Sequence, residues 1–347
     1  MHRRRFTARF TALFAGLFAS AALGFSLPAL SATYKDEYKL STVLGEAYPW
    51  GWGAKRWADL VADKTQGRIK IKVYPGAALV SGDQTKEFTA LRQGVIDIAV
   101  GSTINWSPQI KELNLFALPF LMPDHKALDA LTQGRVGRKV FDLLGERDVV
   151  PLAWGENGFR EVSNSKRSIR TPEDLKGLKM RVVGSPLFLA TFTALGANPT
   201  QMSWADAQPA MATGAVDGQE NPLAVFNAAK LHTVGQKHLT LWGYVADPLM
   251  FVVNKNVWNS WSADDQKAVR EAALQAAKEE VARARAGISA GDDALLKEIQ
   301  ANGVSVVTLT DAERGAFRKA TAGVYKEWAE KIGADLVKQA EEDIGKR

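Results

Sequence analysis

The sequence predicts an α/β protein of two lobes with a cleft between them and long C-terminal helices. Short segments with strand character recur along the chain, stretches of helical periodicity separate them, and the alternation starts again after Asp124. Strands that alternate with helices usually form a sheet covered on both faces. The restart indicates a second unit of the same kind.

The first half is expected to begin with a strand at 38–44 and a helix at 50–64. Residues 68–74 alternate strictly between charged and apolar side chains, as a half-buried strand does. A helix at 83–93 leads to 95–100, a nearly continuous apolar run that is typical of a strand buried on both faces.

The second half repeats the alternation. Its expected elements are a helix at 126–145, strands at 149–154, 177–183 and 304–309, and an amphipathic helix at 311–342. An Ala-, Lys- and Glu-rich stretch at 263–298 is too long for one ordinary helix, so a break is expected near Gly287 or Gly291.

The first 32 residues are predicted to be a cleaved secretion signal. Four arginines precede an apolar run at 10–27, and small residues follow up to Ala32. A retained membrane anchor is the alternative, although the run is short for a membrane span. Residues 3–6 read Arg-Arg-Arg-Phe and fit a loose twin-arginine pattern, so the export route stays open. The expected location is the periplasm.

Charge and composition exclude several classes of function. Removal of the four signal arginines takes the formal net charge from +6 to +2, and no basic stripe interleaved with aromatic residues suggests a nucleic-acid partner. The absence of cysteine excludes disulfides and thiolate metal sites. No hydrolase, zinc-helix or nucleotide-binding motif occurs, and His125, His232 and His238 lack metal-ligand spacing, so no catalytic residue, metal or cofactor is expected.

An arginine inside an apolar strand is the first candidate for a binding site. Arg181 lies in Met180-Arg-Val-Val183, where a guanidinium is costly unless it meets an anion or an open cleft. Its planar fork can hold a carboxylate through two parallel hydrogen bonds. A structural salt bridge or a solvated arginine explains this position equally well.

Three further segments offer polar or flat side chains. Arg160 follows the strand at 149–154 and is expected in a loop, where it could reach the same cleft or simply be solvated. Residues 217–222, which include Glu220 and Asn221, are rich in hydrogen-bonding side chains but could be only a turn. Trp204 could form a flat wall for a ligand, although tryptophan is more often part of a core.

The same segments carry a resemblance to a known family. The chain resembles the solute-binding proteins of TRAP transporters, the DctP family, in ordered motifs at 94–99, 118–121, 171–182, 195–202, 213–223 and 253–258. The resemblance covers essentially the whole chain after the signal. It implies the two-lobed periplasmic-binding-protein fold, whose lobes close on an organic acid and deliver it to a membrane permease driven by an ion gradient.

The resemblance also implies roles for particular residues. Arg181 matches the family's carboxylate-binding arginine, Arg160 a second arginine near the same group, and Asn221 the asparagine that ends the acid-binding motif. Trp204 lies where the family commonly places an aromatic ring against the ligand. Glu220 precedes Asn221 in that motif and is a further candidate ligand contact.

Two more tryptophans are candidate ligand contacts. Trp50 lies beside a loop that could line the cleft, although helix packing explains it as well. Trp242 falls in Leu241-Trp-Gly-Tyr244, where the chain departs from a Thr-Asn-His-like stretch of many relatives, so the far end of the pocket is expected to differ. A dicarboxylate, a sugar acid or a related carboxylate remains open as the ligand.

The expected domain organisation follows the resemblance. Lobe I comprises 33–157 and 248–285, lobe II comprises 158–247 and 286–330, and 331–347 form a C-terminal helix. The expected partners are a small carboxylate and the TRAP permease. A binding protein that serves a membrane sensor kinase and, further off, a secreted enzyme acting on an organic acid are the alternatives.

Overall fold

The computed structural model describes residues 34–289 and 291–345. The predicted secretion signal at 1–32 lies outside the described residues. Within them, no helix combines the length and the apolar character that crossing a membrane requires. All strands belong to one ten-stranded sheet, which falls into two groups that share β4 (Val149–Asn164).

The first group of strands has the order β2-β1-β3-β9-β4. Its other members are β1 (Tyr38–Ser41), β2 (Ile71–Tyr74), β3 (Ile98–Ser102) and β9 (Ala246–Asn254). The strands β1, β2 and β3 run parallel, whereas β9 is antiparallel to both β3 and β4. All nine residues of β9 are buried, as expected for a central strand covered on both faces.

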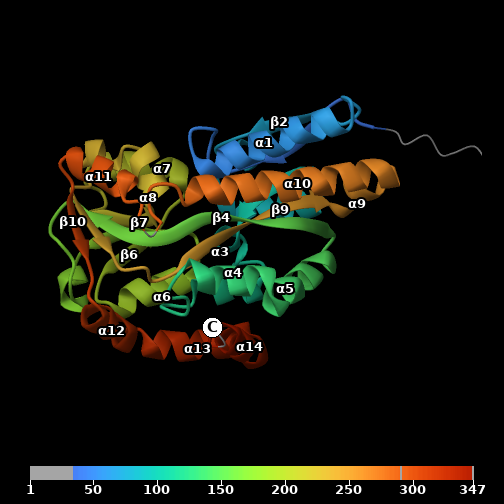
Figure 1. The fold of residues 1–347 in the computed structure, drawn as a ribbon. Coiled ribbons are helices and arrows are strands. Elements are labelled where there is room, and N and C mark those ends of the chain that lie inside the picture. Colours follow the sequence, from blue (N-terminus) through green and yellow to red (C-terminus); the bar gives the residue numbers. More distant parts are fainter. Residues whose placement is uncertain (1–33, 290, 346–347) are drawn as a thin grey trace, which may run out of the picture. The chain divides into compact units, whose positions relative to one another are not determined.

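Helices cover this first group on both faces. On one face α1 (Pro49–Lys64) lies beside α10 (Ala263–Ala284), and α4 (His125–Gln133) and α5 (Arg135–Gly145) lie on the other (Figure 1). The short segments near them are η1 (Ala78–Val80), η2 (Gln84–Lys86), α2 (Glu87–Arg92), α3 (Thr103–Trp106), η3 (Lys111–Ala117) and α9 (Lys255–Asn259). The predicted helices at 50–64 and 83–93 are therefore confirmed within a few residues.

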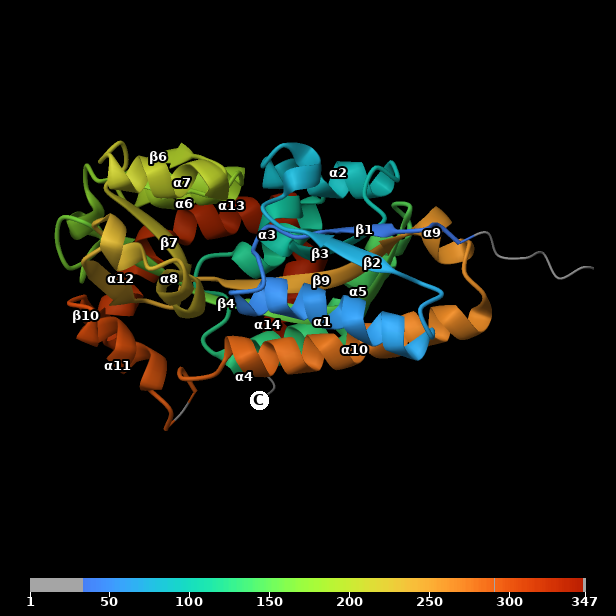
Figure 2. The same cartoon turned by 90° about the horizontal axis from the view of Figure 1, so that it is seen from above.

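The second group of strands has the order β4-β7-β5-β6, and β8 joins β10 to β4. These strands are β5 (Lys179–Val182), β6 (Asn198–Gln201), β7 (Gly218–Pro222), β8 (His238–Leu241) and β10 (Ser305–Thr308). The accompanying helical segments are η4 (Pro172–Leu175), α6 (Pro186–Ala194), α7 (Trp204–Ala212), α8 (Leu223–Ala228), η5 (Leu231–Val234) and α11 (Ala294–Ala301). In Figure 2 they lie at the opposite end of the sheet from β1 and β2.

The strand β4 connects the two groups and positions the candidate site. Its residues 149–159 pair with β9, and its residues 160–164 pair with β7. The register shifts between Glu156 and Gly158, where Gly158 adopts φ +121°, a conformation that glycine tolerates best. The expectation that Arg160 lies in a loop is wrong, because Arg160 begins the paired segment with β7. The turn reading of 217–222 is also wrong, since β7 occupies 218–222.

Two long helices predicted from the sequence are divided. The stretch at 126–145 breaks at Gly134, where an added Cβ would lie 2.2 Å from the backbone oxygen of Ala130. The stretch at 311–342 forms α12 (Asp311–Ala320), α13 (Ala322–Ile332) and α14 (Ala334–Gly345). By contrast, the break expected near Gly287 or Gly291 is present between α10 and α11.

The C-terminal helices bridge the two groups of strands. Helix α13 contacts η3 and α6, while α14 contacts α4 and α5 (Figure 1). The sequence places lobe boundaries at 157/158 and 247/248. The first lies close to the point where β4 changes partners, and the second lies near the start of β9. We therefore propose the predicted division, with 33–157 and 248–285 in lobe I and 158–247 and 286–330 in lobe II.

Candidate functional site

A small cavity lies where β4 changes partners. Its lining comes from both groups of strands: Val43, Leu44, Trp50, Gln84, Asn105, Asn157, Arg160, Arg181, Val183, Trp204, Asn221 and Asp247. The space between their atoms amounts to about 280 Å³, of which only about 20 Å³ admits the centre of a water molecule. This is enough for water and not for an organic acid of several carbons. The side chains around the cavity therefore lie too close together to leave space for such an acid.

Arg181 is a buried cation that has no anionic partner among the described residues. It lies in β5 with 1% of its surface exposed, and its Nε and Nη2 atoms donate to the backbone oxygen of Met202 at 3.0 and 2.8 Å. A guanidinium has five N–H donors, so three of them, including both on Nη1, keep no acceptor within the described part of the chain. Burial lowers the pKa of Arg181 to about 10, which still leaves the group charged at neutral pH.

The Trp204 ring, at the start of α7, covers the Arg181 guanidinium. The Arg181 Cζ atom lies 5.7 Å from the centre of the indole ring, within the range of a cation–π contact. Helix α7 begins at Trp204 because the Ser203 hydroxyl caps it by accepting from the backbone N–H of Asp206. The cap thereby fixes the indole at the edge of the cavity.

Arg160 is held by carboxylates on two sides. Its Nε and Nη2 atoms bind the Glu220 carboxylate, with Nη2 2.9 Å from Oε1, and its Nη1 atom lies 3.0 Å from Asp247 Oδ2. The Tyr244 hydroxyl donates to Glu220 Oε2 at 2.9 Å. Although burial alone would lower it, the Glu220 and Asp247 carboxylates raise the pKa of Arg160. The Arg160 charge is thus already neutralised within the protein.

Asp247 and Asn157 lie side by side at the cavity wall. The Asp247 side chain accepts from the Ser102 hydroxyl at 2.5 Å and from Asn157 Nδ2 at 2.8 Å. Burial raises the pKa of Asp247, and the neighbouring Arg160 cation opposes that rise. Asn157 occupies the irregular part of β4, so the bulge turns its amide toward β9.

Asn221 is positioned by a buried chain of side-chain hydrogen bonds. Its Nδ2 atom donates to Gln219 Oε1 at 2.5 Å, and Gln219 Nε2 donates to the Ser163 hydroxyl at 2.8 Å. The Ser163 hydroxyl donates in turn to Gln236 Oε1 at 2.9 Å. This chain of hydrogen bonds occupies one N–H of the Asn221 amide and leaves the amide oxygen without a protein donor among the described residues.

The structure brings five of the seven predicted ligand contacts to one cavity: Arg181, Arg160, Asn221, Trp204 and Trp50. Glu220 lies behind them as the partner of Arg160. Trp242 is fully buried away from the cavity lining, against Phe120, Phe192, Tyr244 and Phe317, and its Nε1 atom donates to the Arg160 backbone oxygen at 3.1 Å. Trp242 therefore supports Arg160 and does not itself line the cavity.

Several lining residues were not anticipated from the sequence. Gln84 and Asn105 are joined by a 2.7 Å hydrogen bond in the first half of the chain, and Asn157 and Asp247 complete the polar wall. Only Asp247 carried a usable signal, because an aspartate inside the apolar run of β9 has to be paired or to face a cleft.

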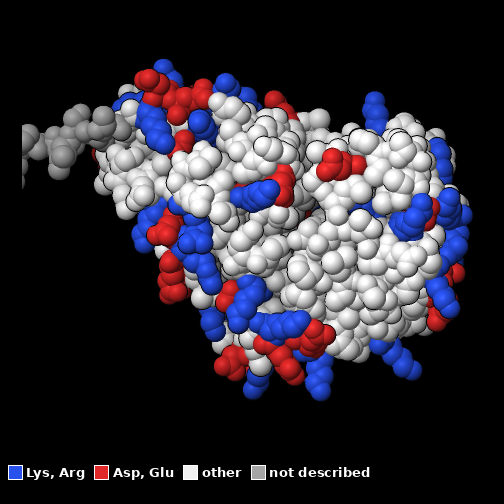
Figure 3. Space-filling model, turned by 180° about the vertical axis from the view of Figure 1, so that it is seen from behind, with Lys and Arg blue, Asp and Glu red and all other residues white. Residues whose placement is uncertain are grey.

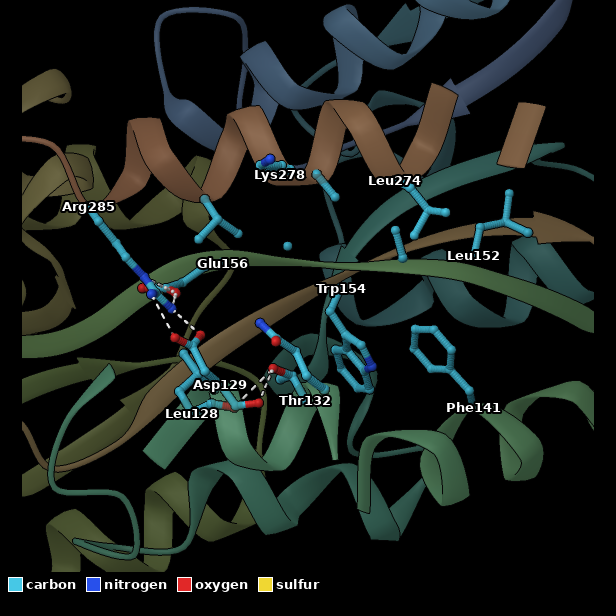
Figure 4. A pocket seen from close by; sticks show the side chains of 15 residues that line it. Leu128, Asp129, Thr132, Phe141, Leu152, Trp154, Glu156, Leu274, Lys278 and Arg285 are labelled. Atoms are coloured by element: carbon cyan, nitrogen blue, oxygen red, sulfur yellow. Dashed lines mark hydrogen bonds and ion pairs between the residues drawn. The ribbon is translucent and has the colours of Figure 1, made fainter. Parts of the chain in front are cut away.

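A wider groove lies between α10 and the α4–α5 pair, with β4 between them (Figure 4). Its apolar wall includes Phe141 stacked on Trp154, with ring centres 4.6 Å apart. The Arg285 guanidinium there lies 2.6 Å from Asp129 and 2.5 Å from Glu156. Because two carboxylates already neutralise it, this groove lacks the unpaired buried cation that Arg181 gives the smaller cavity.

The surface charge offers no competing site on the face seen in Figure 3. Lysine and arginine side chains alternate there with acidic ones, and a broad area has no charged side chain. A nucleic-acid interface would need a continuous basic area. No group of three or more potential metal-binding side chains occurs among the described residues.

The sequence profile of the bacterial extracellular solute-binding proteins, family 7, known as DctP, matches residues 40–331. The chain belongs to this family. The 2,3-diketo-L-gulonate-binding periplasmic protein YiaO of Escherichia coli K12 is 33% identical over 296 residues, which cover 83% of this chain and 86% of YiaO. The expected resemblance to the DctP family is therefore confirmed.

Two solved structures of the DctP family share the fold. A TRAP periplasmic solute-binding protein from Ralstonia eutropha H16, with bound (S)-2-hydroxy-2-methyl-3-oxobutanoate, is 68% identical and covers 90% of this chain and 100% of its own, with a TM-score of 0.90. The sugar acid binding protein DctPAm from Advenella mimigardefordensis, in complex with galactonate, is 29% identical and covers 89% and 98%, with a TM-score of 0.83.

These likenesses confirm the two-lobed α/β fold and the class of function. The DctP chain described here is a TRAP-type solute-binding protein, and its relatives bind carboxylates and sugar acids. Its family and its structural neighbours are ligand-binding transport receptors rather than enzymes. The family is extracytoplasmic.

Proposed function

We propose that this protein captures a small, branched 2-hydroxy or 2-oxo acid, of the size of (S)-2-hydroxy-2-methyl-3-oxobutanoate (2-acetolactate), and delivers it to a TRAP permease. The observation that carries the proposal is the Arg181 guanidinium, which is buried, charged and without a carboxylate partner among the described residues. A ligand carboxylate would supply the missing counter-ion through two charge-assisted hydrogen bonds.

The proposed ligand-binding residues are Arg181, Arg160, Asn221, Trp204, Trp50, Asn157 and Asp247. Arg181 binds the carboxylate and Trp204 shields it from water. Asn221 and Asn157 offer hydrogen bonds to a hydroxyl or oxo group. Val43, Leu44 and Val183 provide an apolar wall for methyl groups. This apolar wall and the small volume of the cavity suit a compact branched acid better than a long polyhydroxylated one.

Capture is proposed to occur by closure of the two lobes. The drawn-together cavity has no room for an acid, so the lobes must separate for entry and close again around the ligand. Hydrogen bonds join the two sides near the cavity, such as the 3.3 Å bond between the Ser107 and Ser185 hydroxyls and the 3.0 Å bond from the Trp204 backbone N–H to Gln84. A ligand that bridges both sides would favour the closed form by its differential affinity.

Delivery to an ion-gradient-driven membrane permease follows from membership of the family, and the proposed location is the periplasm. The proposed role includes no catalysis, since the sequence carries none of the common catalytic motifs. A closed lobe pair would present the permease with a surface that differs from the open one.

A thermal-shift panel of acids tests the proposed function. The panel contains freshly prepared 2-acetolactate, 2-oxo acids, dicarboxylates, sugar acids and aromatic acids. A ligand that binds only the folded state must raise the melting temperature. We expect 2-acetolactate or a close analogue to give the largest shift, and mass spectrometry to recover it unchanged. Turnover of the acid, or a larger shift with a sugar acid, would contradict the proposal.

A further inference from the structure

Asp247 places a second anionic group on the wall of the cavity that contains Arg181. It is 1% exposed and is the second residue of β9, next to the point where β4 changes partners. Its Oδ2 atom accepts from Asn157 Nδ2 and from Arg160 Nη1, while among the described residues its Oδ1 atom accepts only from the Ser102 hydroxyl. A carboxylate offers about four acceptor positions, so one on Oδ1 remains without a protein donor.

Two buried cations and two buried carboxylates lie around the cavity, and both carboxylates pair with Arg160. The cations are Arg160 and Arg181, and the carboxylates are Glu220 and Asp247. One ligand carboxylate beside Arg181 brings one negative charge. A second ligand carboxylate would bring another, with no further buried cation on the cavity wall to receive it. Unbalanced charge in a water-excluded site is strongly unfavourable.

The unused hydrogen-bonding capacity on this side of the cavity is suited to an uncharged group. Asp247 Oδ1 can accept from a hydroxyl, and the second N–H of Asn157 Nδ2 can donate to a hydroxyl or oxo oxygen. Arg160 has four of its five N–H donors occupied by Glu220 and Asp247, which leaves one on Nη1. A ligand carboxylate placed there would lie against Asp247 and would gain only that single N–H from Arg160.

We propose that Asp247, fixed by Arg160, Asn157 and Ser102, makes this a site for monocarboxylates that bear a hydroxyl, and excludes dicarboxylates. The proposal rests on the proposed function, since it concerns the acid that Arg181 anchors. Asp247 acts as a specificity residue in two ways: it repels a second carboxylate, and it accepts a hydrogen bond from the hydroxyl of the preferred acid.

Two ligands with nearly the same shape test this proposal. In 2-hydroxy-2-methylmalonate a carboxylate replaces the acetyl group of 2-acetolactate, so the two acids differ mainly in one negative charge. Calorimetric titration of the wild-type protein should show binding of 2-acetolactate about a hundredfold or more tighter than binding of the malonate. Removal of the hydroxyl, as in 2,2-dimethyl-3-oxobutanoate, should weaken binding about tenfold or more.

An Asp247→Asn variant isolates the charge. It should reduce the preference for 2-acetolactate over the malonate by about tenfold or more, chiefly through tighter binding of the malonate. Asp97→Asn is the matched control, because Asp97 is also a buried aspartate, pairs with Lys35 and does not line the cavity. The control should keep the wild-type preference. Thermal melting of each variant reports whether it is folded.

Separate outcomes bear on the two proposals. If the wild-type protein binds the malonate as tightly as 2-acetolactate, or any dicarboxylate of the panel more tightly than every monocarboxylate, the assignment of Asp247 is overturned. An unchanged preference in folded Asp247→Asn also overturns it. If the protein binds a hydroxy monocarboxylate other than a branched one, the proposed ligand is wrong while the role of Asp247 stands. Binding of no acid at all would contradict the proposed function, and the role of Asp247 with it.

Discussion

The Gln84 side-chain oxygen accepts a 3.0 Å hydrogen bond from the backbone N–H of Trp204, which lies 120 residues further along the chain. Gln84 also donates to Asn105, so its amide is held on the side of the first group of strands. The Trp204 ring covers Arg181 on the other side. This single contact therefore joins the two walls of the cavity directly beside the proposed carboxylate anchor.

Loss of this contact should speed ligand release. We expect Gln84→Ala to weaken binding about three- to tenfold, mostly through faster dissociation, because one neutral hydrogen bond contributes about 0.5–1.5 kcal/mol. Stopped-flow dissociation measures the effect. Gln109→Ala is the control, since the Gln109 side chain is exposed and donates to Thr85 within the same half of the protein. Equal dissociation rates in Gln84→Ala and wild type would show that the contact does not hold the cavity closed.

The two buried arginines should differ when each is replaced by methionine. In the ligand-free protein, Arg160→Met leaves the Glu220 and Asp247 carboxylates without their cation and should cost about 3–5 kcal/mol, or about 5–15 °C in melting temperature. Arg181→Met removes a cation with no carboxylate partner among the described residues, so its melting temperature should change far less. A larger loss of stability in Arg181→Met would mean that Arg181 serves the fold before it serves a ligand.

Fluorescence should report binding through Trp204. A carboxylate placed between Arg181 and the cavity wall changes the electrostatic environment of the ring that covers it. Trp204→Phe should therefore lose most of the ligand-induced change in tryptophan emission. Trp258→Phe serves as the control, because Trp258 lies over Arg270 and outside the cavity. An undiminished signal in Trp204→Phe would place the ligand elsewhere.

The buried Glu87 carboxyl should make the protein less stable as the pH rises toward neutrality. Burial raises the pKa of Glu87 to about 7, although the hydrogen bond that the Ser41 hydroxyl donates to its carboxylate opposes the rise. Between about pH 4.5 and 7 the folded protein thus keeps a proton that the unfolded chain has released. The contribution of Glu87 to stability is therefore complete below about pH 4.5 and is lost as pH rises through 7.

Glu87→Gln should remove this dependence. The variant is expected to be more stable than wild type at pH 8, by on the order of 1–3 kcal/mol, and close to wild type at pH 5. Urea unfolding at the two pH values measures it, with the exposed Glu173→Gln as the control. A variant that loses the same stability at both pH values would contradict the assignment.

The sequence predicts six of the ten strands described, β1 to β5 and β10, because periodic apolar patterns determine which faces are buried. It does not predict β6, β7, β8 or β9. It fails at the divisions within long helices. The amphipathic pattern continues across Gly134 and Gly333, so periodicity alone does not show that the chain turns there. The pattern also does not predict that β4 continues through its central polar residues, because these residues face a cavity that the rest of the fold creates.

The predictability of the site divides in a similar way. Arg181 and Asn221 belong to recognisable motifs, and both line the cavity. Gln84 and Asn157 come from a short helical turn and a bulge, where no periodicity or motif identifies a binding residue. Trp242 is a candidate ligand contact by sequence, yet its large apolar surface is buried in an aromatic cluster.

A crystal structure of the complex with 2-acetolactate tests the central claim most directly. We predict that the ligand carboxylate receives hydrogen bonds of about 2.7–2.9 Å from Nη1 and Nη2 of Arg181, with Trp204 against it and the ligand hydroxyl toward Asp247. A ligand whose carboxylate lies away from Arg181, on Arg160 alone or in the groove beside Arg285, would contradict this account.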